Sequence, residues 1–237
     1  MVQSIEITGK NTIEGGTYNE INIKGMIKIL KDVKANVVNI SGKGFAHGEF
    51  NAKEMILSGK FIADKLVEID DISCSGKIEV EEDLRFQNFD ISGFVTILGN
   101  LVGGDLNITG KLSVDKECEV ENFYTSGVVK ILGLLNADDI EIKVYDHSYI
   151  KEIGGNTISI GNPKSPLNLF RSGKFLESNL LESNLIEGDK IDINYVKAKV
   201  VRGGDIVIKD NVEVDKVEYS GELTVSPKAK IGETIKI

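Results

Sequence analysis

The sequence predicts an all-β fold, a parallel β-helix in which short strands wind into stacked coils. Glycine returns every seventeen residues, and pairs of apolar residues recur at fixed places between the glycines. The 3.6-residue period of an amphipathic helix is absent from this part of the chain. The recurring glycines are Gly25, Gly42, Gly59, Gly76, Gly93, Gly110 and Gly127.

Seven repeats of seventeen residues run from residue 21 to Asp139. Apolar residues mostly occupy positions 1 and 3, 7 and 9, and 13 and 15 of each repeat; in the repeat 72–88 these are Ile72, Cys74, Ile78, Val80, Leu84 and Phe86. A spacing of two is the period of a strand with one buried face. Three short strands separated by corners therefore predict a triangular coil of about seventeen residues. Stacked coils bury the apolar pairs and hydrogen-bond each strand to its copies, as in other solenoids.

Glycine at position 5 predicts the first corner. We expect it to turn the chain through positive φ, which glycine enters without steric cost. Position 17 is mostly Asp or Asn, as in Asp71, Asn88 and Asp105, and predicts a second corner. These side chains tolerate left-handed backbone and bond to their own main chain.

Three segments are expected along the chain. Residues 1–150 form the main β-helix, with an additional coil around Gly9. Residues 151–174 contain two of the three prolines and no constant spacing, which predicts an irregular insertion or linker. Residues 175–237 form a second, smaller β-helical section, because apolar residues there first recur every five residues, at Leu176, Leu181, Ile186, Ile191, Val196 and Val201.

Charge and cysteine content exclude several classes of function. Lys plus Arg number 28 against 37 Asp plus Glu, and the net charge of −9 argues against a nucleic-acid partner. The N-terminus lacks the pattern of a signal peptide, and no run of apolar residues is long enough for a membrane span. We therefore expect a cytoplasmic protein without membrane association. Two cysteines, Cys74 and Cys118, are too few for a disulfide framework and fall at inward positions.

Candidate catalytic and metal-binding groups are sparse. His47 and His147 could act as a base if the chain were a β-helix acyltransferase, but the hexapeptide pattern of such enzymes is missing. Asp71 and Asp105 share a column, yet the glycine-rich pattern of calcium-binding solenoids is absent, so corner turns are the simpler explanation. We expect no catalytic residue, cofactor or metal. The alternative is an enzyme, an acyltransferase or a glycan-active protein, with its site near 143–174.

One outward feature predicts a contact surface. Position 6 is mostly Lys, but in three repeats it is apolar, and the same repeats have leucine at position 10. Apolar side chains that point out of a solenoid indicate self-association or a partner-binding face. The alternatives are that position 10 turns inward or that residues 151–174 cover it. The candidate self-association surface comprises Met26, Leu30, Phe94, Leu98, Val128 and Leu132.

The two ends of the sequence, SIEITG and IGETIKI, also read as strands. Exposed strand edges pair with other chains unless a cap blocks them. Solenoids usually carry such caps, and neither end of this sequence offers an obvious one. End-to-end stacking is therefore expected.

The repeated strands of the form apolar-x-apolar-[Ser/Thr]-Gly resemble the bactofilins, polymer-forming bacterial cytoskeletal proteins. The tail from IEGDKIDINYVKAKV to IGETIKI is similar to that of the longer, two-part bactofilin-like proteins of Gram-positive bacteria. The resemblance covers roughly residues 5–142 and 175–237. It implies a right-handed β-helix, nucleotide-independent self-assembly and a scaffolding role without enzymatic activity. The commonest bactofilins have one core with disordered tails, whereas this sequence adds a second section. A monomeric protein-binding module is the further alternative.

Overall fold

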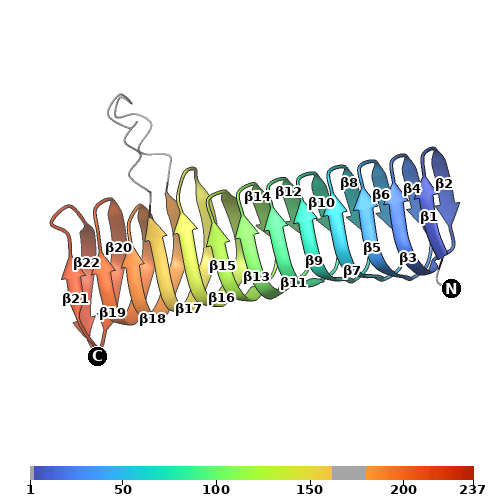
Figure 1. Cartoon of the computed structure of the whole chain (residues 1–237). Helices are drawn as coiled ribbons and strands as arrows, with labels where there is room; N and C mark the ends of the chain where they lie inside the picture. The colour runs from blue at the N-terminus through green and yellow to red at the C-terminus, as the bar shows by residue number, and fades with distance from the viewer. Residues whose placement is uncertain (1–2, 162–179) are drawn as a thin grey trace, which may run out of the picture. The chain divides into compact units, whose positions relative to one another are not determined.

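The structure is a computed structural model that describes residues 3–161 and 180–237. All regular elements in these residues are β-strands, and the strands pair in parallel, which confirms the predicted parallel β-helix (Figure 1). The chain divides into two compact units, residues 1–120 (unit 1) and 121–237 (unit 2). This division falls between 120 and 121, whereas the sequence placed the change of section near 150.

Unit 1 alternates long and short strands. It opens with β1 (Gln3–Ile7), and β15 (Cys118–Thr125) begins in unit 1 and ends in unit 2. The long strands are β3 (Gly16–Ile23), β5 (Val33–Ile40), β7 (Phe50–Leu57), β9 (Val67–Cys74), β11 (Leu84–Ile91) and β13 (Leu101–Ile108). The short strands are β2 (Lys10–Ile13), β4 (Met26–Ile29), β6 (Lys43–Ala46), β8 (Lys60–Ala63), β10 (Lys77–Val80), β12 (Phe94–Ile97) and β14 (Lys111–Val114).

Successive coils of unit 1 stack with the register that the sequence predicts. Phe50 of β7 pairs with Val33 of β5, and Phe61 of β8 pairs with Gly44 of β6, so each residue lies on the one seventeen positions earlier. The inward positions are buried along these columns. Two aromatic pairs add contacts within the core, Phe50 with Phe61 (ring centroids 4.8 Å apart) and Phe86 with Phe89 (5.5 Å).

Each long strand merges two of the three predicted sides. In β9, Val67 and Ile69 are buried, the next two residues are exposed, and Ile72 and Cys74 are buried again. Two consecutive exposed residues shift the phase of the alternation, so the strand bends at that point. The position 17 corner is therefore a bend within a strand. The described non-glycine residues with positive φ are Tyr195 and Asn211, so the left-handed backbone expected at position 17 is wrong.

The position 5 glycines turn the chain, but not for the predicted reason. The glycines with positive φ in the described residues are Gly15 and Gly16, which lie outside this column. A Cβ added to Gly42 would overlap the carbonyl oxygen of Gly25 in the preceding coil. The same overlap recurs from Gly25 to Gly110. Glycine is required because the backbones of stacked coils approach too closely for a side chain.

Hydrogen bonds at this corner explain why Ser or Thr precedes the glycine. The carbonyl oxygen of Ile40 accepts from the backbone N–H of Ser58 (2.9 Å) and of Gly59 (3.0 Å). In the next coil, the Ser75 hydroxyl donates to the Leu57 carbonyl (3.3 Å), which also accepts the Ser75 backbone N–H (2.9 Å). One carbonyl thus satisfies up to three donors, and the hydroxyl supplies one of them.

Unit 2 has coils of varying length. Its strands are β16 (Val128–Lys143), β17 (Ser148–Gly161), β18 (Leu181–Ile193), β19 (Val196–Ile208), β20 (Val212–Tyr219), β21 (Leu223–Val225) and β22 (Lys230–Lys236). Ile158 lies on Ile140, eighteen residues earlier, whereas Ile206 lies on Ile191, fifteen residues earlier. Fifteen residues correspond to three sides of five, which is the predicted five-residue rhythm. Its members Leu181, Ile186, Ile191, Val196 and Val201 are buried, and Leu176 lies outside the described residues.

The predicted irregular insertion over 151–174 is wrong for its first part. Residues 151–161 belong to β17, which pairs with β16 and β18. The buried residues Ile153, Ile158 and Ile160 give these residues the alternation of a strand. The spacing looked inconstant because residues 162–179, which lie outside the described residues, separate β17 from β18 in the sequence.

Alanine at a stacked corner tests the close approach of the backbones. Gly59→Ala should lower the free energy of unfolding by about 1–3 kcal/mol, as overpacking in a tight site does. Gly9→Ala is the matched control, because a Cβ at Gly9 would have nothing within 4 Å, and it should change stability by less than about 0.5 kcal/mol. Urea unfolding followed by circular dichroism measures both. Equal effects of the two substitutions would contradict the explanation.

Thiol labelling tests the inward columns. Burial raises the pKa of the Cys74 thiol to about 11 and also raises the pKa of Cys118. At pH 8 about 0.1% of the Cys74 thiol is then ionised. Iodoacetamide should therefore label the folded protein at least about 100-fold more slowly than the urea-unfolded protein, since the thiolate is the nucleophile. Mass spectrometry of quenched samples gives the rates, and fast labelling of folded Cys74 would show that its column is open.

Candidate functional site

The predicted apolar residues of unit 1 lie on the face formed by the short strands. We call this the short-strand face: the outward side chains at positions 6, 8 and 10 of the coils that contain β2 to β14. Phe94 is 62% exposed, Leu98 45% and Leu30 39%, while Met26 is half-buried. Position 10 therefore stays outward, and the predicted inward turn is wrong for Leu30 and Leu98. The other alternative is that residues 151–174 cover these side chains, and residues 162–174 of that segment lie outside the described residues.

The corresponding pair of unit 2 has a similar exposure within its own unit. Val128 begins β16 and is half-buried, and Leu132 is 39% exposed. Their coil repeats the sequence of the Phe94 coil, with GVVKILG at 127–133 and GFVTILG at 93–99. Each unit thus exposes an apolar pair at positions 6 and 10.

Opposite charges line the two edges of the short-strand face. Phe94 of β12 pairs with Lys77 of β10 and with Lys111 of β14. At position 10, Leu98 lies between the coils that carry Glu81 and Asp115. The face therefore has a lysine edge at position 6 and an acidic edge at position 10, and the apolar pair interrupts both edges in the same coil.

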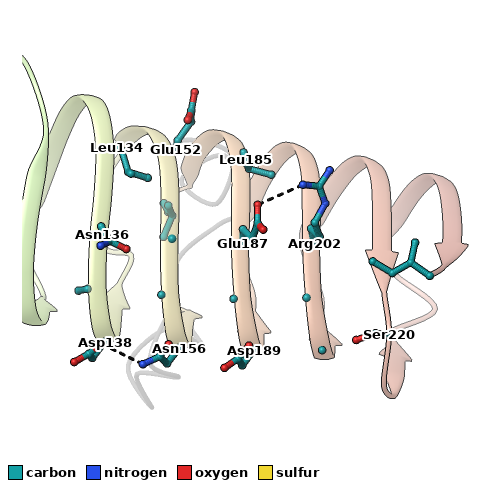
Figure 2. Close-up of a pocket in the computed structure, with 18 residues that line it drawn as sticks. Leu134, Asn136, Asp138, Glu152, Asn156, Leu185, Glu187, Asp189, Arg202 and Ser220 are labelled. Atoms are coloured by element: carbon teal, nitrogen blue, oxygen red, sulfur yellow. Dashed lines mark hydrogen bonds and ion pairs between the residues drawn. The ribbon is translucent and has the colours of Figure 1, made fainter.

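A groove of about 810 Å³ runs across β16 to β19 of unit 2. Figure 2 shows Leu134, Glu152 and Leu185 along one edge and Asp138, Asn156 and Asp189 along the other. Its floor is a glycine column, in which Gly155, Gly188 and Gly203 lie on one another. A Cβ on Gly188 would crowd the carbonyl oxygen of Gly155, so this corner of unit 2 uses the same close approach as position 5 of unit 1.

The polar groups of the groove are predominantly acidic. Asp138, Glu152, Glu187 and Asp189 contribute carboxylates against one cation, Arg202. Asn156 Nδ2 donates to Asp138 Oδ1 (3.1 Å), and Arg202 Nη1 contacts Glu187 Oε2 (3.5 Å). The groove therefore offers hydrogen-bond acceptors to a neutral or cationic ligand and disfavours an anionic one.

Glu218 fixes the position of Arg202 beside the groove. Arg202 Nε donates to Glu218 Oε2 (2.6 Å), and Lys216 Nζ contacts Glu218 Oε1 (2.6 Å). Hydrogen bonds from Lys216 and then from Arg202 lower the pKa of Glu218 below its ordinary value of 4.5. Glu218 in turn raises the pKa of Arg202. Both cations stabilise the ionised carboxylate.

Each of the two histidines has its own surroundings within its unit. His47 lies at position 10 of its coil, and its Nδ1 is 2.5 Å from Oδ2 of Asp64 in the next coil. His147 is exposed in the turn before β17, where its backbone N–H donates to Asp146 Oδ1 (2.7 Å). His47 belongs to unit 1 and His147 to unit 2, and the groove residues do not include His147. The structure leaves the acyltransferase alternative untested.

Acidic side chains at the corners serve as acceptors for the following coil. Asp71 Oδ1 accepts from Asn88 Nδ2 (2.7 Å), and Asp83 Oδ1 accepts from the Asn100 backbone N–H (2.7 Å). Over residues 3–161 and 180–237, no group of three or more His, Cys, Asp and Glu side chains could hold a metal ion. These acids contribute to stacking.

The sequence prediction missed the groove. A usable signal was the repetition of Gly-Gly at 154–155 and 203–204 with Gly188 between them. The spacing from Gly188 to Gly203 is one coil of fifteen, but the spacing from Gly155 to Gly188 includes residues 162–179. These additional residues in the sequence hide the column from a search for a constant period.

Comparison with known proteins gives one weak relationship. A 90-residue segment is 32% identical to the uncharacterized protein YhbE of Bacillus subtilis strain 168, and the matched segment spans 38% of this chain and 37% of that protein. No family model matches the sequence, and no solved structure matches it. The described residues include no helix that is long and apolar enough to cross a membrane. The fold therefore defines the class, an all-β parallel solenoid.

Titration of Glu218 tests the electrostatics beside the groove. Its pKa should lie below 4.5 in the wild-type protein and rise in both Lys216→Gln and Arg202→Gln, because each substitution removes a hydrogen bond and a positive charge that lower it. A lowered carboxyl pKa contributes stability above the unfolded value, and this contribution disappears as the pH falls through the folded pKa. Carbon-13 NMR of the side-chain carboxyl measures the shift directly. An unchanged pKa in both variants would contradict the assignment.

Proposed function

We propose that this protein is a non-enzymatic, bactofilin-like scaffold that assembles end to end through its terminal coils. The supporting observation is that these coils have strand partners on one side only in the described residues. β1 and β2 pair with β3 and β4, and β22 and β21 pair with β20 and β19. Within its own unit, each of these coils thus has a strand edge without a strand partner in the described residues, and such edges pair with other chains.

The terminal coils also leave core positions incompletely covered. In the first coil Ile5 and Ile13 are half-buried, although the residues aligned with them, Ile21 and Ile29, are fully buried. In the last coil Val225 is 41% exposed, and it is aligned with the buried Ile208. A second copy stacked on either end would bury these apolar side chains and extend the strand ladder.

The geometry of parallel stacking gives the assembly a direction. The last coil of one copy would pair with the first coil of another, which is a heterologous, head-to-tail contact. Such contacts produce filaments unless the rotation between copies closes a ring. The bactofilin resemblance of the repeats agrees with this mode of assembly and with a role in the cytoplasm.

Electron microscopy of negatively stained protein tests the proposal. The wild-type protein should form filaments, and Val225→Lys should abolish them, because it buries a charge at the contact between copies. Thr224→Lys is the matched control: it changes the neighbouring residue of β21, which is exposed and alternates with Val225 along the strand, so filaments should persist. Circular dichroism confirms that each variant is folded. Single particles of wild-type protein at high concentration would count against end-to-end assembly.

The groove of unit 2 favours a second candidate, recognition of an elongated, hydroxyl-rich ligand such as a glycan. The groove contains Glu152 and Asn156, which lie in the segment 143–174 where the sequence placed an alternative glycan-active site. If this candidate holds, oligosaccharides should raise the thermal unfolding midpoint of the wild-type protein, and less so that of Glu187→Gln. Chromatography of the oligosaccharides after incubation would show whether any bond is cleaved.

A further inference from the structure

Positions 6 and 10 of the short-strand face match each other coil by coil. Where position 6 is Lys, position 10 is acidic, and where position 6 is apolar, position 10 is apolar. The charged pairs are Lys10 with Glu14, Lys60 with Asp64, Lys77 with Glu81, and Lys111 with Asp115. The apolar pairs in unit 1 are Met26 with Leu30 and Phe94 with Leu98, and the exception is Lys43 with His47.

Contacts within the chain do not account for this match. Position 10 directly follows the short strand. Four residues of extended chain span about 13 Å, which is too far for direct contact between positions 6 and 10. The lysines instead form their described ion pairs with position 8: Lys60 Nζ lies 2.9 Å from Glu79 Oε2, and Lys77 Nζ lies 2.5 Å from Glu79 Oε1. Asp64 contacts His47 in the preceding coil. Glu14 likewise contacts Lys31 in the following coil. None of these described contacts couples position 6 to position 10 of the same coil.

A second copy of the same face would couple the two positions. If two copies face each other across a twofold axis parallel to the stacking direction, position 8 lies on the axis. Position 6 of each coil then opposes position 10 of the same coil in the other copy. Phe94 would meet Leu98 of the second copy, Lys77 would meet Glu81, and Lys111 would meet Asp115. A twofold axis along the strands would instead place lysine on lysine.

We infer that the short-strand face is an isologous self-association surface, on which two copies pair laterally about a twofold axis parallel to the coil stack. This inference deepens the proposed scaffold function and rests on it, since it adds a lateral contact to end-to-end assembly. The coils from Lys60 to Asp115 form its centre. Their position 8 residues are Ile62, Glu79, Thr96 and Ser113, and Glu79 already contacts Lys60 and Lys77 within its own chain.

The lateral contact is small and should be weak in isolated proteins. Four coils spaced by about 4.8 Å and a width of about 13 Å give a flat footprint of about 250 Å² on each copy. Stable interfaces bury about 800 Å² on each partner. Lateral pairing should therefore be reversible, and a measurable fraction of pairs should form only at high protein concentration. It would become strong where end-to-end assembly repeats the face, because linked contacts act together.

Disulfide trapping detects a weak pairing of this geometry. Ser113 lies at position 8, so in Ser113→Cys the new thiols of two copies would meet on the twofold axis. Ser73→Cys is the matched control, since Ser73 is an exposed residue of β9, outside the short-strand face. Cys74 and Cys118 are buried in both proteins. After mild oxidation, Ser113→Cys should give at least about ten times more cross-linked dimer on a non-reducing gel, because only its thiols are juxtaposed.

Charge exchange tests the symmetry. Two double variants are made in the Ser113→Cys protein. The first makes both edges of the face acidic and carries Lys77→Glu and Lys111→Glu. The second makes both edges basic and carries Glu81→Lys and Asp115→Lys. Each double variant alone should lose most cross-linking, because like charges then oppose each other. An equimolar mixture of the two should recover it, with one variant carrying a longer tag so that the mixed dimer is identified. Equal cross-linking at positions 113 and 73, or a mixture that cross-links no better than either variant alone, overturns the inference.

The Val225→Lys background separates this inference from the proposed function. Filaments are removed there if assembly is end to end, whereas the lateral pairing should still be trapped through position 113. If the wild-type protein forms filaments but Ser113→Cys gives no cross-linked dimer, the lateral pairing is contradicted and the scaffold proposal is not. If Ser113→Cys gives the cross-linked dimer but the wild-type protein forms no filaments, end-to-end assembly is contradicted and the lateral pairing is supported.

Discussion

The structure depends on the close approach of consecutive coils at a glycine corner. At position 5 the Cα of one coil lies against a carbonyl oxygen of the coil before it, so that any side chain would collide with backbone. This contact lets the backbone N–H groups of Ser58 and Gly59 both donate to the carbonyl oxygen of Ile40. The hydrogen bonds between coils therefore continue through the turn. Buried backbone donors need such partners. The spacing of coils, the alignment of inward columns and the order of outward columns all follow from it.

Unit 2 applies the same constraint at another corner, with a different consequence. Its glycine column, Gly155, Gly188 and Gly203, falls where unit 1 has inward residues such as Ala52 and Ile69. The coil from Ile191 to Ile206 has fifteen residues, whereas the step from Ile140 to Ile158 in the same unit is eighteen. The surface above the glycines is hollow, and the flanking carboxylates line it. A glycine column with close backbone approach therefore forms a tight corner in unit 1 and the floor of a groove in unit 2.

Sequence reasoning succeeded where one residue type repeats for one physical reason. The inward columns and the seventeen-residue step are visible because burial selects apolar residues at each coil, and the five-residue step at Leu181 to Val201 is visible for the same reason. The reason for the glycines was not accessible, because positive φ and close backbone approach select the same residue. The bend at position 17 was mistaken for a strand end, since exposed Asp and Asn suit both. The groove was missed because it arises from a column that is interrupted by residues 162–179.

Stacking fixes the inward columns and the corners, so the outward columns are where this sequence is free to vary. Position 6 uses that freedom in an ordered way: it is lysine in most coils and apolar in the others, and position 10 is acidic or apolar to match, with His47 as the exception. One exposed ion pair contributes at most about 1 kcal/mol, so a single match between the two positions would mean little. A solenoid repeats its surface about every 4.8 Å, and a polymer of solenoids repeats it again. Small energies that recur in register can therefore determine how copies align, even though no single contact would hold them together.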